Sequence, residues 1–200
     1  MRLIRVTTAL LVLTGVAVFA AVLEQKDQTL VSERYTNAGP RGPLSPGPDD
    51  ARIARVTGAF LERGHYSQQP FNDSVSSKFF DRYLDALDPS HMIFLQPDVS
   101  EFEKWRAQLD DLTLKLGDTS PGDVIFNRFL KRFTQQVEYA TNLIATEEFE
   151  FKGQDRYTLN RKDAPRPKDL NEAKALWRDR VRFEWLSEVL NKEQTATIQT

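Results

Sequence analysis

From residue 49 onward, apolar residues recur with the period of an α-helix, and this pattern predicts five helices. The first is expected at 49–64, where an aspartate can cap the start and a glycine closes the end. The second is expected at 72–87, where Asn or Asp caps the start and the following Asp-Pro pair stops the helix. Their expected inward side chains are Ile53, Val56 and Phe60 in the first, and Val75, Phe79, Tyr83 and Leu87 in the second.

The third and fourth expected helices begin at recognisable start signals. Ser100 has capping-box spacing to Glu103, and Ser120-Pro121 places proline in a first turn, where its missing N–H costs nothing. Apolar residues of the fourth helix recur every 3.5 positions, which predicts a long helix packed nearly antiparallel to a neighbour. The expected inward side chains are Val99, Phe102, Leu109, Leu112 and Leu116 in the third, and Phe126, Leu130, Phe133, Val137, Ala140 and Ile144 in the fourth.

Residues 149–168 lose the helical period and contain glycine and proline, so they are expected to form a long connection with a short extended piece near Phe149–Phe151. The fifth helix is expected from Asp169 to about Gln194. Its apolar residues occupy more than one face, which predicts burial between neighbours. They are Leu176, Trp177, Val181, Phe183, Leu186 and Leu190. The chain is therefore expected to be all-α, an irregular helical bundle of about five helices.

The segment before residue 49 has a different character. Residues 1–5 carry two arginines and residues 6–23 carry no charge, which is typical of a secretory signal peptide, here expected at 1–20. An uncleaved anchor that ends at residue 23 is the alternative, because eighteen apolar residues just reach the thickness of bilayer hydrocarbon. Residues 21–48 are expected to form a flexible linker, since seven of the ten residues at 39–48 are Gly or Pro.

Composition narrows the function classes. Hydrophobic residues make up 40% of the 200 residues and charged residues 28%, a globular balance, with a formal net charge of -2. That charge argues against a nucleic-acid partner, which requires a concentrated basic face. The absence of cysteine excludes disulfides, thiolate nucleophiles and iron–sulfur clusters, and only His65 and His91 could contribute imidazole to a metal site. We therefore expect no cofactor and no metal, and an exported chain without thiols suits an oxidising periplasm.

Polar motifs that could suggest catalysis have simpler interpretations. Ser76–Lys78 places serine beside lysine, but adjacent residues on a helix point about 100° apart, so a polar helix face is favoured. The acidic pairs Asp110-Asp111 and Glu147-Glu148 are interpreted as solvated helix faces, because paired acid/base carboxylates need a concave site.

Asp88 lies three residues before His91, and a carboxylate can orient an imidazole. No nucleophile or metal ligand accompanies them, so a turn held by Asp88, with His91 packed or hydrogen-bonded locally, is favoured. Trp105, Trp177 and Trp185 are expected in the core. The residues by themselves assign no catalytic, cofactor-binding or metal-binding position.

Two segments, Phe80–Leu95 and Tyr157–Lys168, together with Leu176–Arg178, resemble the N-terminal domain of the tail-specific proteases. These are the long bacterial members of the C-terminal processing peptidase family. The resemblance runs from about Arg52 to Leu190 in the family's order and spacing. Arg166 departs from it, because tryptophan is expected there, and this departure is expected to loosen the turn.

The resemblance implies a periplasmic serine endopeptidase that degrades or trims proteins from unstructured C-terminal tails. In the family, a PDZ domain captures the substrate's C-terminus, a downstream domain carries a serine–lysine dyad, and some members recruit a helical-repeat lipoprotein adaptor. No residue here matches the nucleophile or the base. Residues 49–200 are thus expected to be the helical domain, truncated before the PDZ and catalytic domains and inactive alone. A non-enzymatic exported module that binds a partner protein is the alternative.

Overall fold

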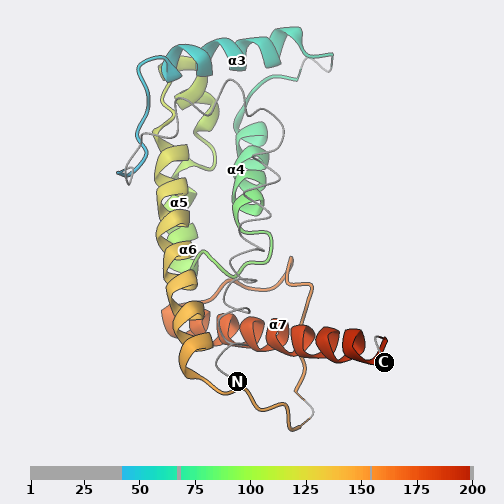
Figure 1. Cartoon of the computed structure of the whole chain (residues 1–200). Helices are drawn as coiled ribbons and strands as arrows, with labels where there is room; N and C mark the ends of the chain where they lie inside the picture. Colours follow the sequence, from blue (N-terminus) through green and yellow to red (C-terminus); the bar gives the residue numbers. More distant parts are fainter. Residues whose placement is uncertain (1–41, 67–68, 154, 199–200) are drawn as a thin grey trace, which may run out of the picture.

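The computed structural model describes residues 42–66, 69–153 and 155–198, and within them it contains helices and no strand (Figure 1). The all-α prediction, with about five helices, is confirmed. The expected signal peptide, the alternative anchor and the linker up to residue 41 lie outside the described residues. The elements are α3 (Asp50–Gly64), α4 (Asp73–Leu87), α5 (Gln96–Phe102), the 3₁₀ turn η1 (Glu103–Trp105), the π-helical turn η2 (Asp111–Leu116), α6 (Ser120–Thr146) and α7 (Leu170–Ile198).

Two helices form the length of the fold, and another helix crosses each end of this pair. α4 and α6 run in the same direction, α3 lies across their first end, and α7 crosses the other end (Figure 1). α6 is the long helix that was expected, and its neighbour of opposite direction is the short α5, through which the chain returns from the end of α4 toward the start of α6 (Figure 1). The first apolar cluster joins α4, α5 and α6 and consists of Phe80, Leu84, Phe94, Phe102 and Ile125. The second fixes α7 and consists of Met92, Leu95, Ala173 and Trp177.

α4 has the expected ends but buries a different face. Asn72 caps it by accepting hydrogen bonds from two backbone N–H groups, and the helix stops before Asp88-Pro89. Phe80 and Leu84 are buried, whereas Phe79 is 55% exposed, so the prediction that Phe79 belongs to the core is wrong. The buried face lies one residue away from the expected stripe, whose other members Val75, Tyr83 and Leu87 are half-buried.

A buried polar contact accompanies this orientation of α4. The hydroxyl of Ser76 is fully buried, where it donates to Asp110 Oδ1 at 2.8 Å and accepts from the Asp110 backbone N–H at 2.9 Å. Two buried polar side chains therefore satisfy each other. The interpretations of Ser76 as part of a polar helix face and of Asp110 as solvated are both wrong, whereas Lys78 and Asp111 are exposed as expected.

The third expected helix is broken into pieces. α5 begins at Gln96, because Asp98 accepts a hydrogen bond from the Leu95 N–H at 3.0 Å, and the expected capping box at Ser100 is wrong. Glu103 instead receives hydrogen bonds from Arg106 within the 3₁₀ region. Phe102 is buried, and Val99 and Leu109 pack on the first apolar cluster, as expected. The expected stripe fails only at its end, after the change to π-helical geometry. Leu116, which was expected to face inward, is 65% exposed.

α3 presents to solvent the face that was expected to be inward. Ile53, Val56 and Phe60 are 56%, 65% and 68% exposed. The opposite face packs on η2 through Gly58, where an added Cβ would lie only 2.3 Å from Leu114 Cδ2. A small residue there allows the two backbones to approach closely, and the large apolar residues are left outside.

α6 and α7 occur where they were predicted. α6 starts at Ser120-Pro121, and Asp169 caps α7 by accepting from the N–H groups of Asn171 and Glu172. The connection before α7 carries no strand near 149–151, so the expected extended piece is not a strand. Phe133 is half-buried and stacked on Phe129, so its expected place in the core is only partly confirmed. Among the other expected inward residues, Leu130, Val137 and Leu190 are 42%, 38% and 48% exposed.

The described end of the expected linker lies against α6. The Leu44 N–H donates to Asn127 Oδ1 and Asn127 Nδ2 donates to the Leu44 carbonyl, both at 2.8 Å. These two hydrogen bonds hold residues 42–48 on the α6 surface without a helix of their own.

Gly117 ends the π-helical turn in the left-handed region, with φ of 67°. A Cβ there would lie 2.6 Å from the Ala51 carbonyl oxygen of α3, a backbone atom that cannot turn aside. Gly117→Ala should therefore lower the free energy of unfolding by about 2–4 kcal/mol. Gly122→Ala is the matched control, because nothing lies within 4 Å of its added Cβ.

The control should stabilise the chain by about 0.4–1 kcal/mol, since alanine restricts the unfolded state. Urea unfolding of both variants measures the difference. Equal effects of the two substitutions would contradict the packing of η2 against α3.

Candidate functional site

Asp88 is the polar centre of the loop between α4 and α5. Its carboxylate is buried, accepts the backbone N–H groups of Met92 at 2.9 Å and Phe94 at 3.0 Å, and forms an ion pair with Arg166. The guanidinium of Arg166 also lies 5.7 Å from the Phe94 ring centroid. The expectation that Arg166 loosens its turn is wrong, because its side chain joins that turn to the loop after α4.

His91 supports the same junction. Its backbone has φ of 52°, its Nδ1 lies 2.7 Å from the Ala164 carbonyl oxygen, and its Nε2 is 3.7 Å from Asp85 Oδ1. The interpretation of Asp88 as the residue that holds a turn is confirmed. The imidazole, however, is hydrogen-bonded to a segment 73 positions away, so its expected local hydrogen bond is replaced by a long-range one.

Asp98 forms a second buried polar centre at the start of α5. It accepts hydrogen bonds from the Leu95 N–H and from the guanidinium groups of Arg128 and Arg132 on α6. Burial opposes ionisation of Asp98, but the hydrogen bonds from Arg132, Leu95 and Arg128 outweigh it. The pKa of Asp98 therefore lies below its ordinary value.

This pKa makes stability depend on pH on the acid side. The pKa of Asp98 is lower in the folded than in the unfolded chain. The ionised carboxylate therefore contributes fully to the free energy of unfolding above the unfolded pKa of about 3.9, and this contribution is lost as the pH falls through the folded pKa. Asp98→Asn should therefore flatten the fall in unfolding free energy below about pH 4. Urea midpoints between pH 2 and 7 measure this slope, and an unchanged acid slope would contradict the assignment.

The other polar motifs also make structural contacts. Ser77 accepts a hydrogen bond from Arg106 Nη1 at 3.2 Å, and Glu147 forms an ion pair with Arg178 of α7. Among residues 42–66, 69–153 and 155–198, no cluster of three or more His, Cys, Asp or Glu could hold a metal ion. Within the same ranges, no helix has both the length and the apolarity needed to cross a bilayer.

The three tryptophans differ in burial. Trp177 is 1% exposed, which confirms its expected place in the core. Trp105 and Trp185 are only half-buried, the first beneath Lys104 at 4.3 Å and the second 6.1 Å from the Phe149 ring. The prediction that all three belong to the core is thus correct for one of them.

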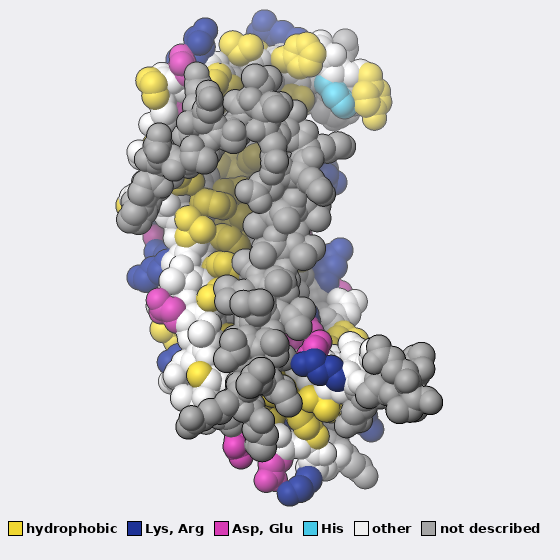
Figure 2. All heavy atoms as spheres, in the orientation of Figure 1, with side chains coloured by type: hydrophobic (Ala, Val, Ile, Leu, Met, Phe, Trp, Pro, Cys, Tyr) yellow, Lys and Arg dark blue, Asp and Glu magenta, His cyan; other side chains and the backbone are white. Residues whose placement is uncertain are grey.

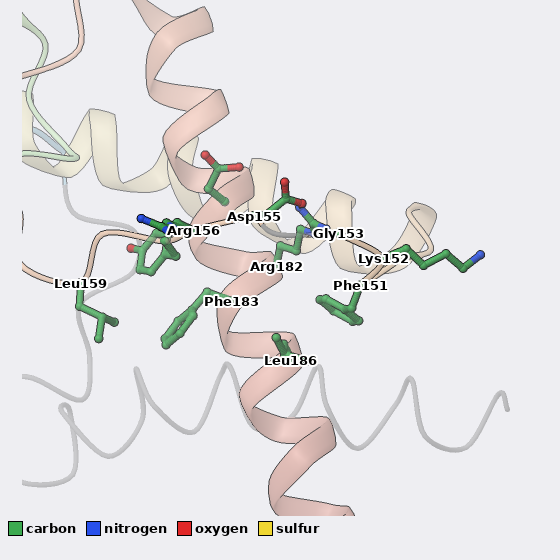
Figure 3. A pocket seen from close by; sticks show the side chains of 11 residues that line it. Phe151, Lys152, Gly153, Asp155, Arg156, Leu159, Arg182, Phe183 and Leu186 are labelled. Atoms are coloured by element: carbon green, nitrogen blue, oxygen red, sulfur yellow. The ribbon is translucent and has the colours of Figure 1, made fainter.

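One pocket lies between the connection and α7 and has a volume of about 490 Å³ (Figure 3). Arg182 holds the connection over α7, since it donates to Asp155 Oδ2 and to the Glu150 carbonyl, both at 2.7 Å. Tyr157 stacks on Phe183 with ring centroids 4.8 Å apart. The lining residues are Phe151, Lys152, Gly153, Asp155, Arg156, Tyr157, Leu159, Asp179, Arg182, Phe183 and Leu186.

The lining of the pocket mixes apolar and charged side chains. Phe183 and Leu186 offer apolar surface from α7 (Figure 3), and Arg156 and Asp179 add charges of opposite sign to the lining. Its lining contains no serine, histidine or cysteine, and its aromatic, aliphatic and charged side chains can bind a partly apolar group. No sequence motif predicted this site, although the aromatic residues of the connection and the apolar residues on more than one face of the last helix were a signal for it.

Taken together, the described residues form a helical domain whose buried polar groups hold loops to helices. Residues 58–200 match the family described as the tail specific protease N-terminal domain. The chain is also 32% identical, over 140 residues, to the tail-specific protease of Haemophilus influenzae, an alignment that covers 70% of this chain and 20% of that protein. The chain thus belongs to the tail-specific protease N-terminal domain family, and it spans about a fifth of the length of the curated relative it matches.

Proposed function

We propose that this chain is the helical N-terminal domain of a periplasmic serine endopeptidase that degrades or processes proteins from their C-terminal tails. The family match over residues 58–200 carries the proposal. The two buried carboxylates of the described structure fit a domain that acts together with others. Asp88 and Asp98 each form an ion pair that holds a loop or helix in place. Capture of the substrate's C-terminus is assigned to a PDZ domain and catalysis to a serine–lysine domain, both of which the family resemblance implies.

The proposed compartment rests on the sequence. The basic start and the uncharged run at 6–23 direct export, and the absence of cysteine suits an oxidising compartment. The proposed partners are protein substrates with unstructured tails, the PDZ and protease domains, and a helical-repeat lipoprotein adaptor. A non-enzymatic binding module is the second candidate, favoured by a pocket whose lining combines aromatic, aliphatic and charged side chains.

Reading the gene beyond the codon for Thr200 separates the two candidates. The proposal expects an open frame that encodes a PDZ domain and serine–lysine motifs. The product of the complete frame should then cleave an unfolded reporter with an apolar C-terminal tail and should spare the same reporter with a charged tail. The 200 residues alone should turn over neither reporter.

Two outcomes would contradict the proposal. A stop codon followed by an unrelated gene would favour the binding module. Turnover by the 200-residue chain that is lost on substitution of one of its own serines would place the nucleophile here instead.

A further inference from the structure

α3 lies across one end of the molecule and is held there by its inner side (Figure 1). Ile53, Val56 and Phe60 are exposed, and Figure 2 shows hydrophobic side chains on the outer surface of that end. The main packing partner of α3 is η2, which it meets at the buried Gly58. A helix that buries so little apolar surface is expected to open more easily than α4 and α6. The polar contacts of its first turn therefore matter for its docking.

The first turn of α3 meets the start of α6 and the middle of α4 at a group of polar side chains. Asp50 of α3 accepts a hydrogen bond from the Gly47 N–H at 2.7 Å. The Tyr83 hydroxyl of α4 donates to the Gly122 carbonyl oxygen at 3.2 Å. Asp123 follows on α6, where the charge of Asp50 acts on Asp123 and the charge of Asp123 acts on Tyr83. Three elements of the fold therefore meet around the Asp123 carboxylate.

Two buried oxygens of this junction have no hydrogen-bond partner in the described part of the chain. They are Asp123 Oδ2 and the hydroxyl oxygen of Thr119, the N-cap residue of α6. A buried carboxylate oxygen without a donor is unfavourable, because it has lost its hydration and gained no hydrogen bond. A proton on Asp123 removes the charge and supplies an O–H donor to the junction.

The pKa of Asp123 reflects this environment. Burial raises the pKa most, and the charge of Asp50 raises it further. The pKa of Asp98 shifts in the opposite direction, because Asp98 accepts hydrogen bonds from two guanidinium groups and a backbone N–H. Since the folded pKa of Asp123 lies above the unfolded value of about 3.9, its contribution to stability is complete below that value. The contribution is lost as the pH rises through the folded pKa.

Charged groups that flank the junction on α3, η2 and α6 are paired among themselves. The pairs are Asp49 with Arg52 at the start of α3, Asp111 with Lys115 in η2, and Arg128 of α6 with Asp98 and Glu101. On α4, the facing group is the Tyr83 hydroxyl, whose pKa is raised by burial and by Asp123, so it keeps its proton near neutral pH. Proton binding at the junction therefore centres on Asp123.

We propose that Asp123 is a protonation switch, which holds the first turn of α3 against α6 when it is protonated and loosens this contact when it is ionised. α3 should then open as a local unit at neutral pH, while α4 and α6 stay packed through the first apolar cluster. The switch requires neither export nor peptidase activity, so its failure would leave the proposed function untouched.

Hydrogen exchange in the full chain, followed by mass spectrometry at about pH 4.5 and about pH 7.5, tests the proposal. Protection of the α3 amides is expressed relative to that of the α6 amides in the same molecule, after correction for intrinsic exchange rates. Asp123→Asn keeps the shape of the side chain but cannot ionise. Glu138→Gln is the matched control, because Glu138 is an exposed carboxylate on the same helix.

In the wild-type chain, the relative protection of α3 should be at least about twofold higher at the lower pH. Glu138→Gln should keep this ratio, whereas Asp123→Asn should keep the relative protection high at both pH values. Asp50→Asn should reduce the ratio without abolishing it, because the burial of Asp123 remains. A wild-type ratio of one or less, or a ratio that Asp123→Asn leaves unchanged, would overturn the proposal.

Discussion

Replacing Trp177 with alanine should lower the free energy of unfolding of the chain by about 3–5 kcal/mol. The indole is 1% exposed, lies among Met92, Leu95 and Ala173, and packs 6.1 Å from the Tyr139 ring. Its Nε1 also donates to the Met92 carbonyl at 2.6 Å, so alanine would leave both a cavity and an unpaired buried acceptor.

Urea unfolding followed by far-ultraviolet circular dichroism measures this loss. Trp185→Ala is the control, since Trp185 is only half-buried against Phe149 and its removal should cost less. A loss below about 1 kcal/mol for Trp177→Ala would show that α7 is not fixed to the loop after α4 as described.

Asp88→Ala should also lower the free energy of unfolding by about 3–5 kcal/mol, because it removes one partner of a buried ion pair. The substitution leaves the Arg166 guanidinium, whose side chain is 11% exposed, without its carboxylate. It also leaves the N–H groups of Met92 and Phe94 without their acceptor.

The matched control is Asp85→Ala, three residues earlier on α4. Its side chain is 53% exposed and lies 3.7 Å from the His91 Nε2, so its loss should change stability by less than about 1 kcal/mol. If both substitutions had the same small effect, Asp88 would not be the centre of the loop.

Both ends of α4 and the starts of α6 and α7 could be predicted from sequence because their causes are local. Asn72 and Asp169 cap helices by bonding N–H groups within three residues, and Asp88-Pro89 and Ser120-Pro121 act through backbone geometry alone. Such signals require no knowledge of tertiary contacts.

The buried faces could not be predicted in the same way. α4 rotates so that Ser76 meets Asp110, a residue 34 positions away, and α3 turns its small residues to η2. An apolar stripe shows that a helix is amphipathic but does not identify its neighbour, which explains the errors at Phe79 and Phe60.

The pocket and the polar centres depend on still longer connections. Arg182 meets a carboxylate 27 positions earlier, and Arg166 meets Asp88 across 78 positions. Within the sequence, Arg166 was noticeable only as a departure from its family. Its role became evident when the fold placed its guanidinium against a buried carboxylate.

Asp88 and Arg166 join the two segments by which the chain resembles its family, Phe80–Leu95 and Tyr157–Lys168. A double-mutant cycle of Asp88→Ala and Arg166→Ala, measured by urea unfolding, tests that role most directly. The predicted result is a coupling energy of about 1–3 kcal/mol, because the second substitution costs little once the ion pair is broken. Effects that add to within about 0.5 kcal/mol would show that the two segments are held together by other contacts.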